Sequence, residues 1–89
     1  MTEPAPLTIR YFAWLRELVG LAEEQLHPPP EITTVAALIP WLAGRDAAHA
    51  HAFAARASIR CAVNQEFATP EARLAPGDEI AFFPPVTGG

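Results

Sequence analysis

Hydrophobic and polar positions alternate along three stretches of the chain, residues 7–13, 58–63 and 79–83, as in strands that bury one face. The shorter polar stretch 23–27 is predicted to pair with the first of these as a hairpin. A turn at 64–66 leads to Phe67, which we expect in a brief edge strand. The inward positions of the first and second stretches are expected to be Leu7, Ile9, Tyr11, Ala13, Ile59, Cys61 and Val63.

Helical spacing replaces this alternation in three places. Residues 14–21 place apolar side chains on one side and have Gly20 near their end. Residues 35–43 should follow a cap at Thr33 or Thr34 and end at Gly44, with Pro40 kinking or shortening the helix. The alanine-rich residues 47–57 are predicted to form a helix capped by Asp46 and anchored by Phe53. The expected apolar faces are Leu15, Leu18 and Val19 in the first helix, and Val35, Leu38, Ile39 and Leu42 in the second.

The order of these elements predicts an α+β fold, a mixed sheet of about four or five strands packed on a helix. The prolines at 28–30 look like a spacer within one domain, so we expect a single domain over 1–89. Residues 74–78 are predicted to turn, with Gly77 at positive φ. If the first and last strands lie side by side at the centre of the sheet, the chain leaves the fold from a well-anchored strand.

The last eight residues have a different character, two aromatics followed by Pro84-Pro85 and then Val86-Thr87-Gly88-Gly89. Proline lacks an N–H and fixes φ, so residues 84–89 are expected to be an extended tail outside the fold. Such a tail could reach roughly 20 Å at about 3.3 Å per residue. The glycine pair has no Cβ and could enter a narrow slot, which would deliver the Gly89 carboxylate at the tip.

Composition narrows the class of partner. The 89 residues carry a net charge of −4 and include no lysine, which argues against a nucleic-acid backbone or an anionic membrane as the partner. One cysteine excludes an internal disulfide. Neither a secretory signal nor an apolar run of about 20 residues is visible, so a cytoplasmic location is expected.

The C-terminal residues 74–89, LAPGDEIAFFPPVTGG, closely resemble the terminus of the small, sulfur-carrying subunits of molybdopterin synthase, the MoaD family. Residues 11–20, YFAWLRELVG, resemble the family's first strand and helix, and residues 62–65, AVNQ, its middle strand and turn. The resemblance extends over nearly the whole chain and implies a β-grasp, ubiquitin-like fold with a flexible Gly-Gly tail.

The same resemblance implies a reaction cycle. An E1-like activating enzyme uses ATP to adenylate the Gly89 carboxylate, and sulfur from a persulfide then displaces AMP to leave a thiocarboxylate. The tail, Pro84 to Gly88, enters the large synthase subunit and donates sulfur to cyclic pyranopterin monophosphate, commonly in a heterotetramer. A thiocarboxylate is a soft nucleophile that is ionised near neutral pH. The catalytic side chains are expected in the large subunit, with no cofactor and no metal bound by this chain.

Partner-contact positions follow from the resemblance at Phe67, Phe83 and Arg16. Phe67 and Phe83 could instead belong to the core, and Arg16 could be a solvated helix residue. We favour docking for the two aromatics because interfaces favour exposed aromatics near their centre.

Other residues have simpler explanations. Cys61 alternates with apolar neighbours and is expected to be a small buried hydrophobe. His49 and His51 point to different sides of a helix and lack a third ligand, so a metal site is not expected. Asp78 and Glu79 belong to a turn and a strand start rather than to an acid/base pair. Trp14 and Trp41 are expected to be packing residues.

Three other functions remain open at this point. The chain could carry sulfur for thiamin, cysteine or tRNA thiolation. It could be a ubiquitin-like modifier that is joined to target lysines through Gly89. It could also be a binding module whose proline-rich tail is itself the ligand of an aromatic groove.

Overall fold

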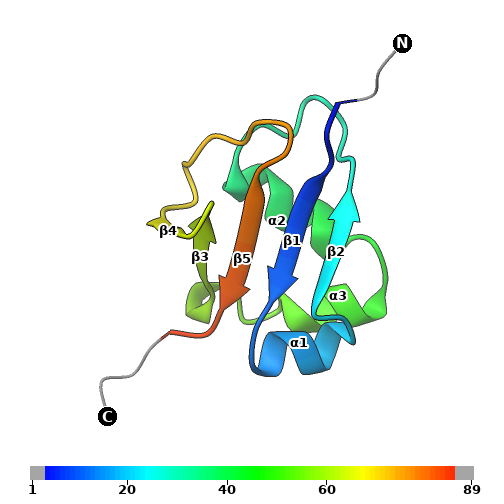
Figure 1. Ribbon diagram of the computed structural model, residues 1–89. Coiled ribbons are helices and arrows are strands. Elements are labelled where there is room, and N and C mark those ends of the chain that lie inside the picture. The colour runs from blue at the N-terminus through cyan, green and yellow to red at the C-terminus, as the bar shows by residue number, and fades with distance from the viewer. Residues whose placement is uncertain (1–3, 86–89) are drawn as a thin grey trace.

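The computed structural model describes residues 4–85, which form one mixed sheet with helices against one of its faces (Figure 1). The sheet has five strands in the order β2-β1-β5-β3-β4. Strands β1 and β5 are parallel neighbours, whereas the other pairs are antiparallel. The strands are β1 Leu7–Tyr11, β2 Glu23–Leu26, β3 Arg60–Val63, β4 Glu66–Ala68 and β5 Glu79–Phe83. The predicted α+β sheet, with the first and last strands side by side, is therefore confirmed.

The two neighbouring strands β1 and β5 bury alternate side chains. Ile9 and Ile80 are Cα partners, and both are 0% exposed. Tyr11 and Phe82 are the next partners on this face and are also buried. Ala13 was expected to continue the buried face, and this is wrong. Its φ of 55° turns the chain into the first helix and leaves its side chain exposed.

Three helices and a 3-10 turn make up the second layer. They are α1 Trp14–Val19, α2 Val35–Ala43, α3 Ala47–Ala52 and the 3-10 turn Arg56–Ser58. Helix α1 ends at Gly20, whose φ of 89° is left-handed and therefore suits a residue without Cβ. The last residue of the helix is Val19, so the predicted end at residue 21 was two residues too late.

Helix α2 has the expected cap and buried face. Thr34 Oγ1 accepts a hydrogen bond from Ala37 N at 3.2 Å, and Gly44 is the C-terminal cap. The four predicted apolar positions are all buried. Of the two effects expected of Pro40, shortening is wrong, because the helix continues past Pro40 to Ala43, and a kink stays a prediction. Pro40 is exposed, so its ring faces solvent rather than disturbing the core.

Helix α3 is shorter than predicted. Asp46 caps it as expected, but Phe53 is already its C-terminal cap, and residues 54–57 do not extend the helix. The chain must leave the helix layer here to enter β3, which begins at Arg60 rather than at Ser58. Phe53 remains a buried anchor, with 4% of its surface exposed.

Tight turns connect the remaining strands. Asn64 and Gln65, with φ of 51° and 70°, form the two-residue connection between β3 and β4, which leaves Glu66 inside β4 rather than in the turn. Gly77 has a φ of 87°, as predicted for the turn that precedes β5.

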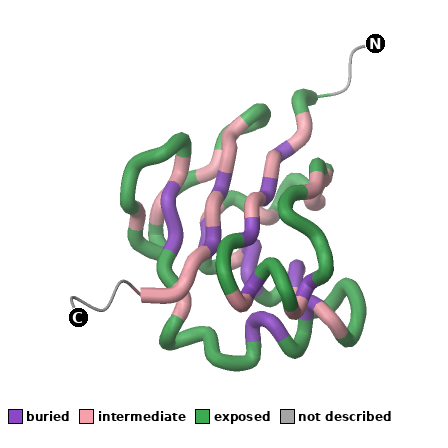
Figure 2. Tube along the Cα trace, turned by 60° about the horizontal axis from the view of Figure 1, so that its bottom comes forward, coloured by how far each residue is buried: buried purple, intermediate pink, exposed green. Residues whose placement is uncertain are grey.

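The core lies between the sheet and the helices, and Figure 2 shows its buried positions interspersed along the strands. Trp14 and Trp41 pack against this core from its edge, as expected. None of the helices in the described part of the chain is long and apolar enough to cross a membrane.

Candidate functional site

The open face of the sheet, opposite the helices, carries an unusual group of apolar side chains. Strand β5 alternates across the two faces, so Ile80 and Phe82 enter the core while Ala81 and Phe83 point to the open face. Phe83 is half-buried there. The prediction that Phe83 is a surface aromatic rather than a core residue agrees with this alternation.

A row of paired residues explains why this face is hollowed. Ala62 of β3 is the Cα partner of Ala81 on one side and of Phe67 on the other. Ala81 is in turn the partner of Arg10 in β1. Side chains of paired residues lie on the same face of a sheet, so two alanines stand between two long side chains.

The hollow between them has a volume of about 480 Å³ and is open to solvent. We call it the aromatic hollow, and it is lined by Arg10, Phe12, Ala62, Gln65, Phe67, Glu79, Ala81, Phe83 and Pro84. Phe67 is 85% exposed, more than the other large apolar side chains of residues 4–85. Its ring meets that of Phe83 edge to face, with the centroids 5.8 Å apart. Phe12, which is 41% exposed, also lines the hollow.

Charged groups border the aromatic hollow on its β1 side. The Arg10 guanidinium lies 5.7 Å from the centre of the Phe12 ring and 3.6 Å from carboxylate oxygens of Glu23 and Glu79. Exposed ion pairs of this kind contribute about 0–1 kcal/mol each to stability. They give the apolar centre a charged rim on this side, and an apolar centre with a polar rim is the usual anatomy of a protein–protein interface.

The tail begins at the edge of this hollow. Pro84 lines it, and Pro84 and Pro85 continue directly from β5 as half-buried residues outside any strand. Val86, Thr87, Gly88 and Gly89, which the sequence assigns to the reactive tail, lie outside the described residues. Any protein that binds the aromatic hollow would therefore also meet the first residues of the tail.

A hydrogen-bonded brace fixes the turn next to the hollow. The Asn64 side chain donates to Asp78 Oδ1 at 3.0 Å and accepts from Glu79 N at 3.0 Å. As predicted, Asp78 lies in a turn and Glu79 begins a strand. The brace ties the β3–β4 turn, which carries Gln65, to the beginning of β5.

The third predicted contact residue, Arg16, lies elsewhere. It is exposed on α1 and does not line the aromatic hollow. Sequence reasoning also missed Phe12 and the two alanines. Phe12 follows the buried Tyr11, so its outward direction could have been inferred from the alternation of β1, whereas the alanines become meaningful only through the strand order.

Cys61 is buried on the opposite, helix-facing side of β3, as expected. Its Sγ donates to the carbonyl oxygen of Ala68 at 3.3 Å, and burial raises the pKa of the thiol. A thiol held protonated is a poor nucleophile. In residues 4–85, no three His, Cys, Asp or Glu side chains are placed so that they could hold a metal ion, and His49 and His51 are respectively buried and exposed.

This chain is similar to known proteins in both sequence and structure. The molybdopterin synthase sulfur carrier subunit of Haemophilus influenzae is 39% identical over 93% of this chain and 99% of its own length. The crystal structure of the small archaeal modifier protein 1 of H. volcanii has a TM-score of 0.73 at 30% identity, over 92% of this chain and 99% of that one.

A third comparison supports the fold alone. Subunit 1 or 2 of the Helicobacter pylori molybdopterin-converting factor, solved as a complex of the two, matches with a TM-score of 0.63 at 19% identity, over 94% of this chain and 99% of that one. The expected ubiquitin-like β-grasp fold is confirmed by these neighbours. Residues 9–89 match the model of the ThiS family, and with the near-full-length relative this shows that the chain belongs to the ThiS family.

Proposed function

We propose that this chain is the sulfur carrier subunit of molybdopterin synthase and that the Gly89 carboxylate is the group that carries sulfur. The observation that supports this most directly is the aromatic hollow at the start of the tail, where the exposed Phe67 and the half-buried Phe83 present their rings to a partner. The name of the Haemophilus influenzae relative points the same way.

The proposed cycle begins with an E1-like activating enzyme. The Gly89 carboxylate attacks the α-phosphorus of ATP and expels pyrophosphate, which gives an acyl adenylate. The persulfide sulfur then attacks the carbonyl carbon and displaces AMP, which gives an acyl disulfide. A second thiol of the sulfur donor cleaves its S–S bond, which releases the thiocarboxylate and leaves a disulfide on the donor. ATP is consumed in the adenylation as a substrate held by the activating enzyme.

The second half of the cycle takes place in the large subunit. The tail enters its active site, and the thiocarboxylate sulfur attacks cyclic pyranopterin monophosphate; two such transfers build the dithiolene of molybdopterin. Among residues 4–85 the charged side chains that line the aromatic hollow are Arg10 and Glu79, which pair with one another. We therefore assign the acids and bases of this transfer to the large subunit.

The aromatic hollow is the proposed docking surface for that subunit. Its centre is apolar and its border is charged, so burial would release water from the aromatic rings while the ion pairs remain at the rim. Exposed aromatic residues of this kind supply much of the binding energy in protein complexes. The likeness to a chain from a solved complex of subunits 1 and 2 supports pairing with a large subunit. We propose that two such pairs form a heterotetramer.

A second candidate function rests on the likeness to the small archaeal modifier protein 1. A modifier would use the same adenylated Gly89 but would be joined to lysines of other proteins. The two functions differ in the fate of the activated carboxyl group. In the sulfur carrier it becomes a thiocarboxylate and returns to a carboxylate, whereas in the modifier it becomes an amide.

The experiment that separates them is a reconstituted transfer reaction. Thiocarboxylated chain is mixed with the large subunit and cyclic pyranopterin monophosphate, and both the product and the carrier mass are followed. Formation of molybdopterin with return of the carrier to its carboxylate mass supports the sulfur carrier. Retention of the thiocarboxylate with the large subunit present, together with lysine-linked adducts in cells, would support the modifier instead.

A further inference from the structure

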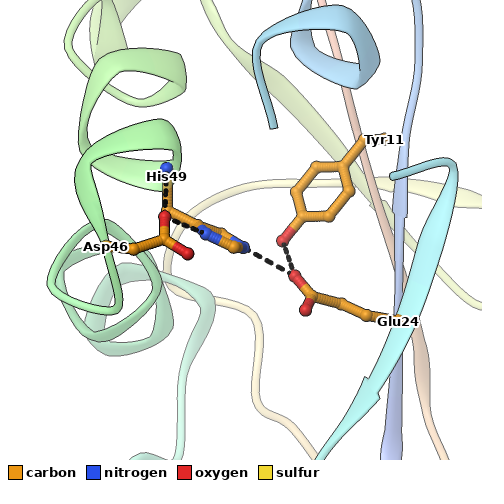
Figure 3. Close-up of polar contacts among 4 residues, drawn as sticks. All are labelled: Tyr11, Glu24, Asp46 and His49. Carbon is orange, nitrogen blue, oxygen red and sulfur yellow. Dashed lines mark hydrogen bonds and ion pairs between the residues drawn. The ribbon is translucent and has the colours of Figure 1, made fainter. Parts of the chain in front are cut away.

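Four polar side chains meet between the sheet and α3, away from the aromatic hollow (Figure 3). They are Tyr11 from β1, Glu24 from β2, and Asp46 and His49 from the N-terminal end of α3. His49 is buried, with 4% of its surface exposed. The proposed sulfur-transfer function uses none of them.

His49 lies between two carboxylates. Its Nδ1 is 2.7 Å from Asp46 Oδ1, and its Nε2 is 2.7 Å from Glu24 Oε2. Asp46 Oδ1 also accepts the backbone N–H of His49 at 2.8 Å, and Glu24 Oε2 accepts the Tyr11 hydroxyl at 2.7 Å. Figure 3 shows the imidazole bridging from α3 to the edge strand β2.

The number of protons in this arrangement can be counted. A neutral imidazole has one N–H, and an ionised carboxylate can only accept. Both ring nitrogens of His49 face a carboxylate oxygen at hydrogen-bond distance, so both contacts are attractive only if both nitrogens carry a proton. The geometry therefore fits the imidazolium, held by two charge-assisted hydrogen bonds.

The surroundings of His49 agree with this count. Burial alone would favour the neutral ring, but the hydrogen bonds to Glu24 and Asp46 outweigh it and raise the pKa of His49. The backbone and side-chain hydrogen bonds from His49 lower the pKa of Asp46. Burial and the bond to Glu24 raise the pKa of Tyr11, so its hydroxyl remains a donor. Arg45, next to Asp46, is the nearby cation; Arg16 and Glu17 of α1, which packs on α3, are exposed.

Strand β2 depends on this contact because it is an edge strand with few inward side chains. It pairs only with β1 in the described sheet, and its two inward positions are Glu24 and Leu26. One of the two side chains that could fasten β2 to the helix layer is thus a carboxylate. We propose that His49, as an imidazolium, clamps β2 to α3 and that this side of the fold loosens when His49 loses its proton.

The direction of the pH dependence follows from the linkage between protonation and folding. Folding raises the pKa of His49 above 6.5, its value in the unfolded chain. The proton on His49 therefore stabilises the fold fully below pH 6.5, and this stabilisation is lost as the pH rises through the pKa of the folded protein. The raised pKa of the Cys61 thiol also makes stability fall as the pH rises, but only from about its ordinary pKa of 9.0 upward. The window between pH 6.5 and about pH 8 therefore isolates His49.

The test combines NMR of the histidine rings with urea unfolding at several pH values, followed by tryptophan fluorescence. We expect both ring nitrogens of His49 to carry protons at neutral pH. The unfolding equilibrium constant of the wild type should rise by up to about tenfold per pH unit above 6.5, the limit for one proton. His49→Gln should lose this dependence, whereas His51→Gln, a change at an exposed histidine of the same helix, should keep it.

Two results would overturn the proposal. One is a neutral His49 ring at pH 7 in the wild type, which can be observed even if His49→Gln fails to fold. The other is a pKa of His49 that stays unchanged in Glu24→Gln, a variant that keeps an acceptor for Tyr11 but removes the negative charge. A lower pKa of His49 in Glu24→Gln would support the clamp.

Discussion

Phe67 and Phe83 meet edge to face on the open side of the sheet, with ring planes at 63° and centroids 5.8 Å apart. They come from β4 and β5, which are separated by β3 in the sheet. Phe67 remains 85% exposed in this contact, so the pair buries little of its apolar surface within the chain. The remaining surface is available to a partner, at the position where the tail begins.

Replacing Phe67 by alanine should weaken binding of the large subunit without unfolding the carrier. A central interface aromatic contributes about 2 kcal/mol or more, so the dissociation constant should rise by about thirtyfold or more. The free energy of unfolding should change by about 0.5 kcal/mol or less, because the side chain is exposed. Titration calorimetry and urea unfolding measure the two quantities.

The matched control is Leu21→Ala. Leu21 is 43% exposed but does not line the aromatic hollow. This variant should bind the large subunit as the wild type does. Equal losses of affinity in Phe67→Ala and Leu21→Ala would contradict a docking site at the hollow.

The neighbouring residues Phe82 and Phe83 should respond in opposite ways to truncation. Phe82 is 0% exposed, and Phe82→Ala should cost about 3–5 kcal/mol of unfolding free energy. Phe83→Ala should cost less stability and should weaken binding of the large subunit instead. Urea unfolding of both variants checks this; a larger loss of stability in Phe83→Ala would contradict the assigned faces of β5.

Pro40→Ala should stabilise the chain. Proline within a helix removes one backbone hydrogen bond and costs about 3 kcal/mol, and Pro40 is an exposed residue inside α2. The gain should be smaller than this, because proline also restricts the unfolded chain. An increase in the midpoint of urea unfolding is expected. A decrease would mean that the Pro40 ring makes contacts that alanine cannot replace.

Cys61→Ala should leave sulfur transfer unchanged. The thiol is buried, and its raised pKa keeps it protonated at neutral pH. Alkylation of Cys61 by iodoacetamide should accordingly be slow in the folded protein and fast in urea. A folded Cys61→Ala variant that no longer accepted sulfur would show that the thiol takes part in the transfer.

Local patterns predicted most of the fold. Alternation identified the buried positions of β1, and the cap at Thr34 and the stop at Gly44 placed α2. The errors lie where contacts between distant parts of the chain determine the end of an element. Helix α3 ends at Ala52 because the chain must turn there to enter β3, and the alanine-rich sequence gives no local signal of this end.

The candidate site was predicted in part. The resemblance identified Phe67 and Phe83, and the structure places them in contact. The hollow itself depends on Ala62 and Ala81 becoming neighbours through the strand order, which a sequence pattern does not specify. The His49 clamp was missed for the same reason, since Glu24 belongs to a polar edge strand distant from His49 in sequence.

The central claim is that Gly89 accepts sulfur, and the intact mass of the chain tests it most directly. The chain is incubated with a cognate activating enzyme, ATP and a sulfur source, beside a variant that lacks Gly89. We expect the mass to rise by the exchange of one oxygen for one sulfur, and the variant to stay unchanged. No gain of mass, with an activating enzyme that is competent on another carrier, would contradict the account.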